Sequence, residues 1–118
     1  MRAAGAIYEQ RACAELQRAG FKLLATNYTT RHGEIDLVML DGETVVFVEV
    51  RHRLRATHGD AAMSITATKQ SRIIAAAQLW LAAHTRHAQR TCRFDVVCYD
   101  GSGTDVRTQH WRAAFDAS

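Results

Sequence analysis

Apolar side chains recur at helical intervals over residues 8–19, and glutamines and arginines occupy the opposite face. The apolar face carries Tyr8, Ala12, Leu16 and Ala19. Gly20 then ends the predicted helix. At about 100° per residue, Glu9 projects within roughly 20° of Leu16, on the apolar face. A carboxylate on a face that packs against a core is costly unless it has a partner or a function.

Segments rich in β-forming residues follow this helix. They predict a strand at residues 21–28, and two further strands at residues 34–40 and 44–53 after a connecting loop at residues 27–33. The last two strands are joined by Asp41-Gly42, and an Asp-Gly pair between β-rich runs is a strong hairpin signal. The second hairpin strand is apolar on both faces except for Glu49, as expected of a central strand covered on both sides. Glu49 is therefore predicted to be buried.

The turn of the hairpin decides which residues face each other. With a two-residue Asp41-Gly42 turn, Asp36 lies opposite Phe47 and is a diagonal neighbour of Glu49 on the same face. A four-residue turn places Asp36 directly opposite Glu49. Only a three-residue turn without a compensating bulge would separate the two acids. The hairpin therefore predicts that their side chains meet.

The rest of the chain predicts a loop at residues 54–65 and a long helix at residues 66–87. A strand at residues 93–99 and a short terminal helix at residues 111–115 follow. Thr66 or Thr68 caps the long helix, which ends near His87. Lys69 lies one turn before Ile73 on the inner stripe of this helix, so its ammonium can reach the sheet. The order α-β-β-β-α-β predicts an α/β fold with one mixed sheet flanked by helices.

Composition bounds the class of protein. The length of 118 residues suits a single domain, residues 1–118, and no repeat or charge block divides it. Three cysteines without C-x-x-C spacing disfavour a disulfide framework and a thiolate zinc site, which favours a reducing compartment. The sequence contains neither a signal-peptide pattern nor an apolar run long enough to span a membrane. We therefore expect a cytoplasmic protein.

Candidate chemistry comes from three acids. Two buried carboxylates side by side repel each other unless one is protonated or a cation lies between them. Mg²⁺ and Mn²⁺ prefer such oxygen ligands, and Mg²⁺ keeps several waters, so two or three carboxylates suffice. Glu9, Asp36 and Glu49 are the candidate metal ligands, and Arg51 projects on the same face as Glu49. The plainer interpretation is a Glu49–Arg51 ion pair, a loop cap at Asp36 and a surface acid at Glu9.

Basic residues surround the predicted site, although the net charge is only +3. Arg51, Arg53 and Arg55 alternate towards the following loop, Arg31 precedes the hairpin, and Lys69 lies on the long helix. Arginine binds phosphate in a bidentate manner, so this distribution predicts nucleic acid, and DNA in particular, as the partner. A solvated strand end and a codon bias towards arginine are the plainer alternatives. The sequence leaves open whether the domain acts alone or as a homodimer.

Two further patterns are weaker. His84 and His87 have helical metal-ligand spacing, but no third ligand is near in the sequence, which favours an ordinary pair at the edge of the core. Asp95 interrupts the strand at residues 93–99. It marks either the edge of a site or, the favoured interpretation, the outward face of that strand.

Several motifs occur together in one order along the chain: Glu9, Ala12, Leu16, Gly20-Phe21, Asn27, G-E-I-D-L at residues 33–37, V-F-V-E-V-R-H-R at residues 46–53, Lys69 and R-F-D-V-V at residues 93–97. With these motifs, nearly the whole chain resembles the bacterial YraN family. That family is similar to the restriction-endonuclease-like fold, close to archaeal Holliday-junction resolvases. In that fold a helical Glu, a strand Asp and a Glu-x-Lys motif hold Mg²⁺.

The resemblance implies that Glu9, Asp36 and Glu49 are metal ligands, and that Asp36, Glu49 and Arg51 are catalytic. Arg51 stands where the wider fold has lysine. Because an arginine stays protonated, it can only orient water or stabilise charge on phosphate. We therefore expect a Mg²⁺- or Mn²⁺-dependent endonuclease acting on structured or single-stranded DNA. The alternative is a nucleic-acid-binding or protein-interaction module that keeps the fold without turnover.

Overall fold

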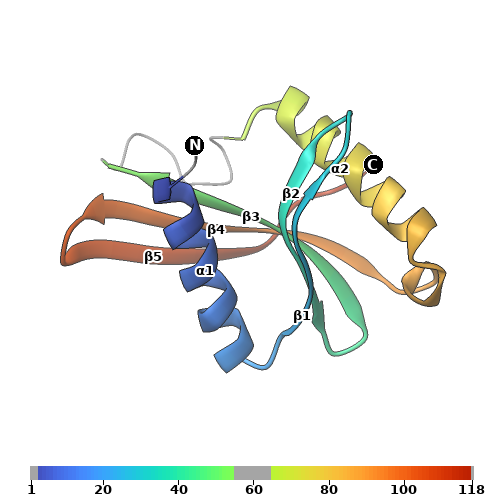
Figure 1. Cartoon of the computed structure of the whole chain (residues 1–118), viewed down its shortest axis with the longest axis horizontal. Coiled ribbons are helices and arrows are strands. Elements are labelled where there is room, and N and C mark those ends of the chain that lie inside the picture. Colours follow the sequence, from blue (N-terminus) through green and yellow to red (C-terminus); the bar gives the residue numbers. More distant parts are fainter. Residues whose placement is uncertain (1–2, 55–64, 118) are drawn as a thin grey trace.

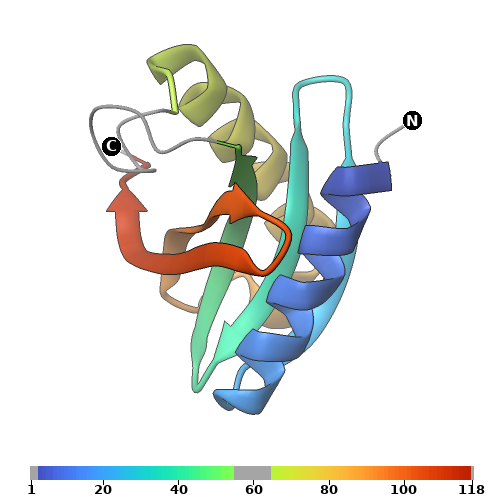
Figure 2. The same ribbon diagram turned by 90° about the vertical axis from the view of Figure 1, so that its left-hand side faces the viewer.

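The computed structural model describes residues 3–54 and 65–117, which form a twisted five-stranded sheet with a helix on each face (Figures 1 and 2). The elements in chain order are α1 (Ala3–Arg18), β1 (Lys22–Thr29), β2 (Glu34–Asp41), β3 (Thr44–Arg53), α2 (Ala67–Ala83), the short 3-10 helix η2 (Thr85–His87), β4 (Cys92–Ser102) and β5 (Asp105–Phe115). The strands lie in the order β1-β2-β3-β4-β5. All neighbours are antiparallel except β3 and β4, which are parallel. The mixed α/β sheet flanked by helices is confirmed.

Strand β3 is the centre of the core because both of its faces are covered. On one face α1 packs Ala12 and Leu16 against the sheet, and on the other face α2 packs Ile73 and Trp80. The side chains of residues 45–48 are at most 1% exposed. Burial on both faces explains why this run is apolar throughout rather than alternating. Glu49 ends the run and is itself buried, as predicted.

The β2–β3 turn differs by one residue from the Asp41-Gly42 turn expected from the sequence. Asp41 pairs with Thr44, so the turn consists of Gly42 and Glu43, and Gly42 has a φ of 60°. Glycine adopts this positive φ without a steric penalty because it has no Cβ atom, whereas a residue with a side chain incurs one. The ladder then continues to the pair Leu37 and Val48. Continued by one residue, the same register places Asp36 opposite Glu49. This is the pairing that the sequence predicts for a four-residue turn.

The predicted helix over residues 111–115 is wrong, because these residues are the end of β5. Ser102 pairs with Asp105 across a tight turn in which Gly103 has a φ of 59°. Strand β5 then pairs along the free edge of β4, and Trp111 packs against buried residues of that strand. Backbone pairing and burial along a sheet edge outweigh the weak local helix propensity of this segment.

Helix α2 ends at Ala83 rather than near His87. The rings of His84 and His87 stack on Trp80, with centroid distances of 4.1 and 5.6 Å. Burial and neighbouring cations lower the pKa of His87. The pair therefore belongs to the edge of the core, as the favoured interpretation predicts. No helix in the described part of the chain has the length and apolar character needed to cross a membrane.

Candidate functional site

The carboxyl groups of Asp36 and Glu49 meet where β2 and β3 separate. The backbone ladder between these strands ends at Leu37 and Val48. Beyond it, Oδ2 of Asp36 accepts a hydrogen bond of 2.8 Å from the Val50 N–H, so a side chain takes the place of a backbone carbonyl. Asp36 and Glu49 are 4% and 6% exposed. The two acids that the hairpin predicts to meet are therefore adjacent and nearly buried.

The proximity of these acids changes the chemistry of Glu49. Burial and the neighbouring Asp36 raise the pKa of Glu49 to about 7, although Lys69 acts in the opposite direction. The Nζ atom of Lys69 lies 2.5 Å from Oε2 of Glu49. A lysine ammonium therefore supplies the positive charge that a buried carboxyl pair requires.

These residues line a pocket of about 500 Å³ between the sheet and the start of α2. The sheet contributes Glu34, Asp36 and Glu49, which form an acidic wall. The first two turns of α2 contribute the facing wall, which is basic and polar and consists of Thr66, Thr68, Lys69 and Arg72. The hydroxyl oxygen of Thr66 caps the helix by accepting the Lys69 N–H at 3.1 Å. The cap fixes the backbone from which Lys69 reaches the acids.

The loop between β1 and β2 closes one side of the pocket. A Cβ atom at Gly33 would lie 2.5 Å from the carbonyl oxygen of Arg72, so only glycine permits this contact with α2. The Thr30 hydroxyl organises the loop by accepting the N–H groups of His32 and Gly33 at 3.1 and 3.0 Å. The exposed Arg31 lies in the same loop.

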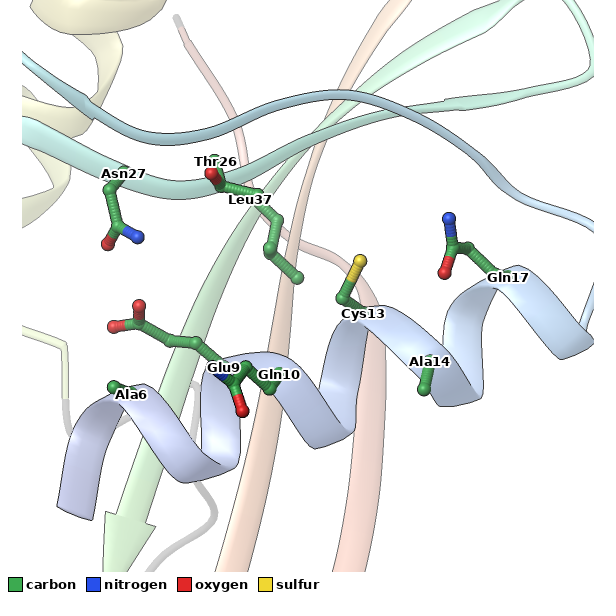
Figure 3. A pocket seen from close by; sticks show the side chains of 9 residues that line it. All are labelled: Ala6, Glu9, Gln10, Cys13, Ala14, Gln17, Thr26, Asn27 and Leu37. Atoms are coloured by element: carbon green, nitrogen blue, oxygen red, sulfur yellow. The ribbon is translucent and has the colours of Figure 1, made fainter. Parts of the chain in front are cut away.

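Glu9 lies elsewhere. It is 6% exposed and lines a separate pocket of about 300 Å³ beneath α1, together with Cys13, Asn27 and Leu37. Figure 3 shows its side chain extending from α1 towards Asn27. Over residues 3–54 and 65–117, no group of three or more His, Cys, Asp or Glu side chains is placed to hold a metal ion. The structure therefore brings Asp36 and Glu49 together, with Lys69, and leaves Glu9 in its own pocket.

The predicted arginines have different environments. Arg51 is half-buried and does not line the acidic pocket, and its Nε atom is buried without a hydrogen-bond partner among the described residues. Arg53 binds both carboxylate oxygens of Asp100, at 2.7 and 3.0 Å, and its side chain is 12% exposed. Arg55 lies outside the described residues. Among the predicted phosphate contacts that the structure describes, Arg31 and Lys69 are therefore the accessible ones.

Glu34 and Arg72 also line the pocket, and neither was predicted as a site residue. The sequence carried a signal for both. Glu34 is two residues before Asp36 on the same strand, and residues two apart in a strand share a face. Arg72 is three residues after Lys69 on the same helix, and residues three apart share a helix surface.

Asp95 is fully buried and belongs to an ion-pair cluster, so the outward-facing interpretation is wrong. It does not line the acidic pocket. Two nitrogen atoms of Arg93 donate to its carboxylate at 2.9 and 3.1 Å, and His110 Nε2 lies 2.8 Å from Oδ2. The Ala113 N–H donates to Oδ1 at 3.0 Å. Burial alone would raise the pKa of Asp95, but these hydrogen bonds together hold it below its ordinary value of 3.8. The cluster ties β5 to β4.

The element order, with a carboxyl pair at the divergence of two central strands, is consistent with a nuclease-like core. The chain belongs to the family described as Uncharacterised protein family UPF0102, which matches residues 8–99, and the resemblance to the YraN family is thereby confirmed.

Proteins named UPF0102 protein are similar over most of their length. That of Pseudomonas aeruginosa (strain LESB58) is 51% identical over 111 residues, which cover 92% of this chain and 89% of the relative. That of Pseudomonas fluorescens (strain Pf-5) is 49% identical over 110 residues, with coverages of 92% and 89%. That of Stutzerimonas stutzeri (strain A1501) is 47% identical over 110 residues, with coverages of 92% and 91%.

Proposed function

We propose that this chain is a Mg²⁺- or Mn²⁺-dependent endonuclease that hydrolyses phosphodiester bonds in structured or single-stranded DNA. The observation that supports the proposal is the division of one pocket into an acidic wall and a basic wall. Asp36 and Glu49 come from the sheet, and Lys69 and Arg72 come from α2. Such a pocket offers carboxylates to a hard divalent cation and cationic side chains to an adjacent phosphate.

The donor set fits the ion. Carboxylate oxygens are the preferred ligands of Mg²⁺, which also keeps several waters, so Asp36 and Glu49 are sufficient to hold it. The ammonium of Lys69 at 2.5 Å from Glu49 is a positive charge already accommodated at this position. Glu34 is a third acid in the same pocket, whereas Glu9 lines the other one. When bound, the ion would lower the pKa of a coordinated water and offset charge on the phosphate.

The protein's own residues would orient the reactants. Asp36 is held by the Val50 N–H, which fixes the direction of its second oxygen. On the facing wall, the start of α2 places the positive end of a helix dipole, with Lys69 and Arg72, where a phosphate can bind. Arg51 lies outside the pocket, and an arginine side chain does not act as a general base, so in this proposal Arg51 transfers no proton.

A second candidate function is a nucleic-acid-binding module without turnover. The placement of Glu9 in a separate pocket favours this candidate, because the nuclease-type set of three carboxylates is not assembled in the described residues. The arginine at position 51 favours it as well, since it cannot replace a lysine that loses a proton.

Incubation of the purified protein with branched, single-stranded and duplex DNA distinguishes the two functions. We expect cleavage with Mg²⁺ or Mn²⁺, no cleavage with EDTA, and no cleavage by Asp36→Asn or Glu49→Gln. Asp105→Asn removes an exposed acid at the β4–β5 turn and is the matched control, which should retain activity. Binding without cleavage at high enzyme excess would favour the binding module. A protein that neither binds nor cleaves DNA would contradict both functions.

A further inference from the structure

Lys69 occupies an unusual position for a cation. It lies in the first turn of α2, which contains no acidic residue. The positive end of the helix dipole disfavours a lysine there. Its Nζ atom nevertheless lies 2.5 Å from Oε2 of Glu49, across the pocket. The attraction of the carboxyl pair therefore outweighs the unfavourable helix position.

The two partners differ in freedom to move. The Glu49 side chain is 6% exposed, whereas the Lys69 side chain is 47% exposed. Asp36 is held by the Val50 N–H, and the backbone of Lys69 is held by the Thr66 cap. A lysine side chain can rotate about its flexible four-carbon stem without unpacking the core. The acids are thus the fixed part of the site, and the ammonium is the movable part.

We propose that Lys69 is an exchangeable counter-ion, which pairs with Glu49 in the metal-free protein and is displaced by a divalent cation towards the phosphate of the substrate. This inference rests on the proposed function and adds a role for one residue. A divalent cation carries two positive charges and an ammonium carries one, so the divalent cation is the stronger counter-ion for two adjacent carboxyl groups. The displaced ammonium stays in the pocket beside Arg72, on the wall where phosphate would bind.

Lys69 and the divalent cation repel each other and compete for the Glu49 carboxylate. Each therefore weakens the binding of the other by the same factor. Removal of the lysine charge should therefore strengthen metal binding while it weakens the binding of phosphate. A lysine that only supported Glu49 structurally would have the opposite effect on the metal. The sign of the change in metal affinity is thus the informative quantity.

Calorimetric titration of the metal-free protein with Mn²⁺ tests the inference, together with binding of a fluorescent single-stranded oligonucleotide in Ca²⁺. Lys69→Met should bind Mn²⁺ about five-fold or more tightly than the parent and bind the oligonucleotide more weakly. Lys69→Arg keeps the charge and should bind Mn²⁺ as the parent does. Arg72→Met removes a charge from the same wall, but the ion pair with Glu49 is made by Lys69. Arg72→Met should weaken binding of the oligonucleotide and change the affinity for Mn²⁺ by less than two-fold.

Circular dichroism establishes that each variant is folded, and Lys69→Gln replaces Lys69→Met if the latter is not. An Mn²⁺ affinity that is unchanged or reduced in the neutral variant, in a parent that binds Mn²⁺, overturns the exchange and leaves the proposed function standing. A parent that binds no Mn²⁺ overturns the proposed function and this inference with it.

Discussion

At the scale of single residues, Asp36 and Glu49 are an unfavourable pair unless a positive charge is present. Both are nearly buried, and burial together with Asp36 raises the pKa of Glu49 to about 7. Repulsion between the two carboxyl groups destabilises the folded metal-free protein, which is the physical reason to expect a cation beside them. Lys69 offsets part of the charge, and its half-exposed side chain limits what this ion pair contributes to stability.

Metal should therefore raise the melting temperature. A ligand that binds only the folded state stabilises it by about 2.7 kcal/mol at one hundred times its Kd. Asp36→Asn removes the repulsion and a ligand, while an amide oxygen can still accept the Val50 N–H. The metal-free variant should be no less stable than the parent and should show no shift with Mn²⁺ in differential scanning fluorimetry. A parent without a shift would contradict the metal site.

Asp95 is the opposite case, a buried acid whose partners more than offset its desolvation. Asp95→Asn should lower the free energy of unfolding in urea by about 3 kcal/mol or more at pH 7, because Arg93 and His110 lose a buried partner. Its folded pKa lies below the ordinary 3.8, so this stabilisation is present above that value and is lost as the pH falls through the folded pKa.

The difference between Asp95→Asn and the parent should therefore shrink below about pH 4. Asp105→Asn changes an exposed acid of β5 and is the control, which should have the same free energy of unfolding as the parent at pH 7. An Asp95→Asn protein as stable as the parent at pH 7 would show that the cluster is not needed to hold β5.

At the scale of elements, the site depends on one local hairpin and on two contacts between segments that are distant in the sequence. The β2–β3 hairpin brings the acids together, the capped start of α2 brings Lys69 to them, and the β1–β2 loop packs against α2 through Gly33. Local patterns predict each element separately. The contact at Gly33 depends on backbone atoms of two elements, which no periodicity in the sequence indicates.

Gly33→Ala tests this contact. The added methyl group would meet the Arg72 carbonyl oxygen, so the loop and α2 must separate, at a cost of about 1–3 kcal/mol. The stabilisation by Mn²⁺ should fall as well, because α2 carries the facing wall of the site. Gly42→Ala has open space but a φ of 60°, so it should cost about 1 kcal/mol and leave the metal response intact. An equal stabilisation of the two variants by Mn²⁺ would show that the contact at Gly33 is not needed for metal binding.

At the scale of the whole molecule, the distribution of charge matters more than the net charge of +3. Arg53 and Arg93 are bound in ion pairs inside the protein, whereas Arg31, Lys69 and Arg72 are placed around or beside the acidic pocket. Three exposed basic residues therefore lie in or beside the pocket that carries the carboxyl pair. This arrangement supports DNA as the partner in the proposed function.

Arg31→Gln should weaken binding of single-stranded DNA in Ca²⁺ and lower the slope of log affinity against log salt by about one, because one phosphate contact is lost. The matched control is Arg86→Gln, since Arg86 is exposed beyond the end of α2 opposite to the pocket. It should leave both quantities unchanged. Equal losses in the two variants would indicate non-specific attraction by net charge rather than a path beside the pocket.

The sequence by itself determined the two helical faces, the apolar central strand, the buried Glu49 and its meeting with Asp36, because these follow from local periodicity and from a hairpin of short sequence separation. Only the tertiary structure decided that residues 111–115 join a strand, since free backbone groups at the edge of β4 select their conformation. Likewise, Arg53 is paired with Asp100, and Glu9 lies apart from Asp36, because helix and sheet packing sets distances between residues far apart in the chain. Spacing along the sequence carries no information about those distances.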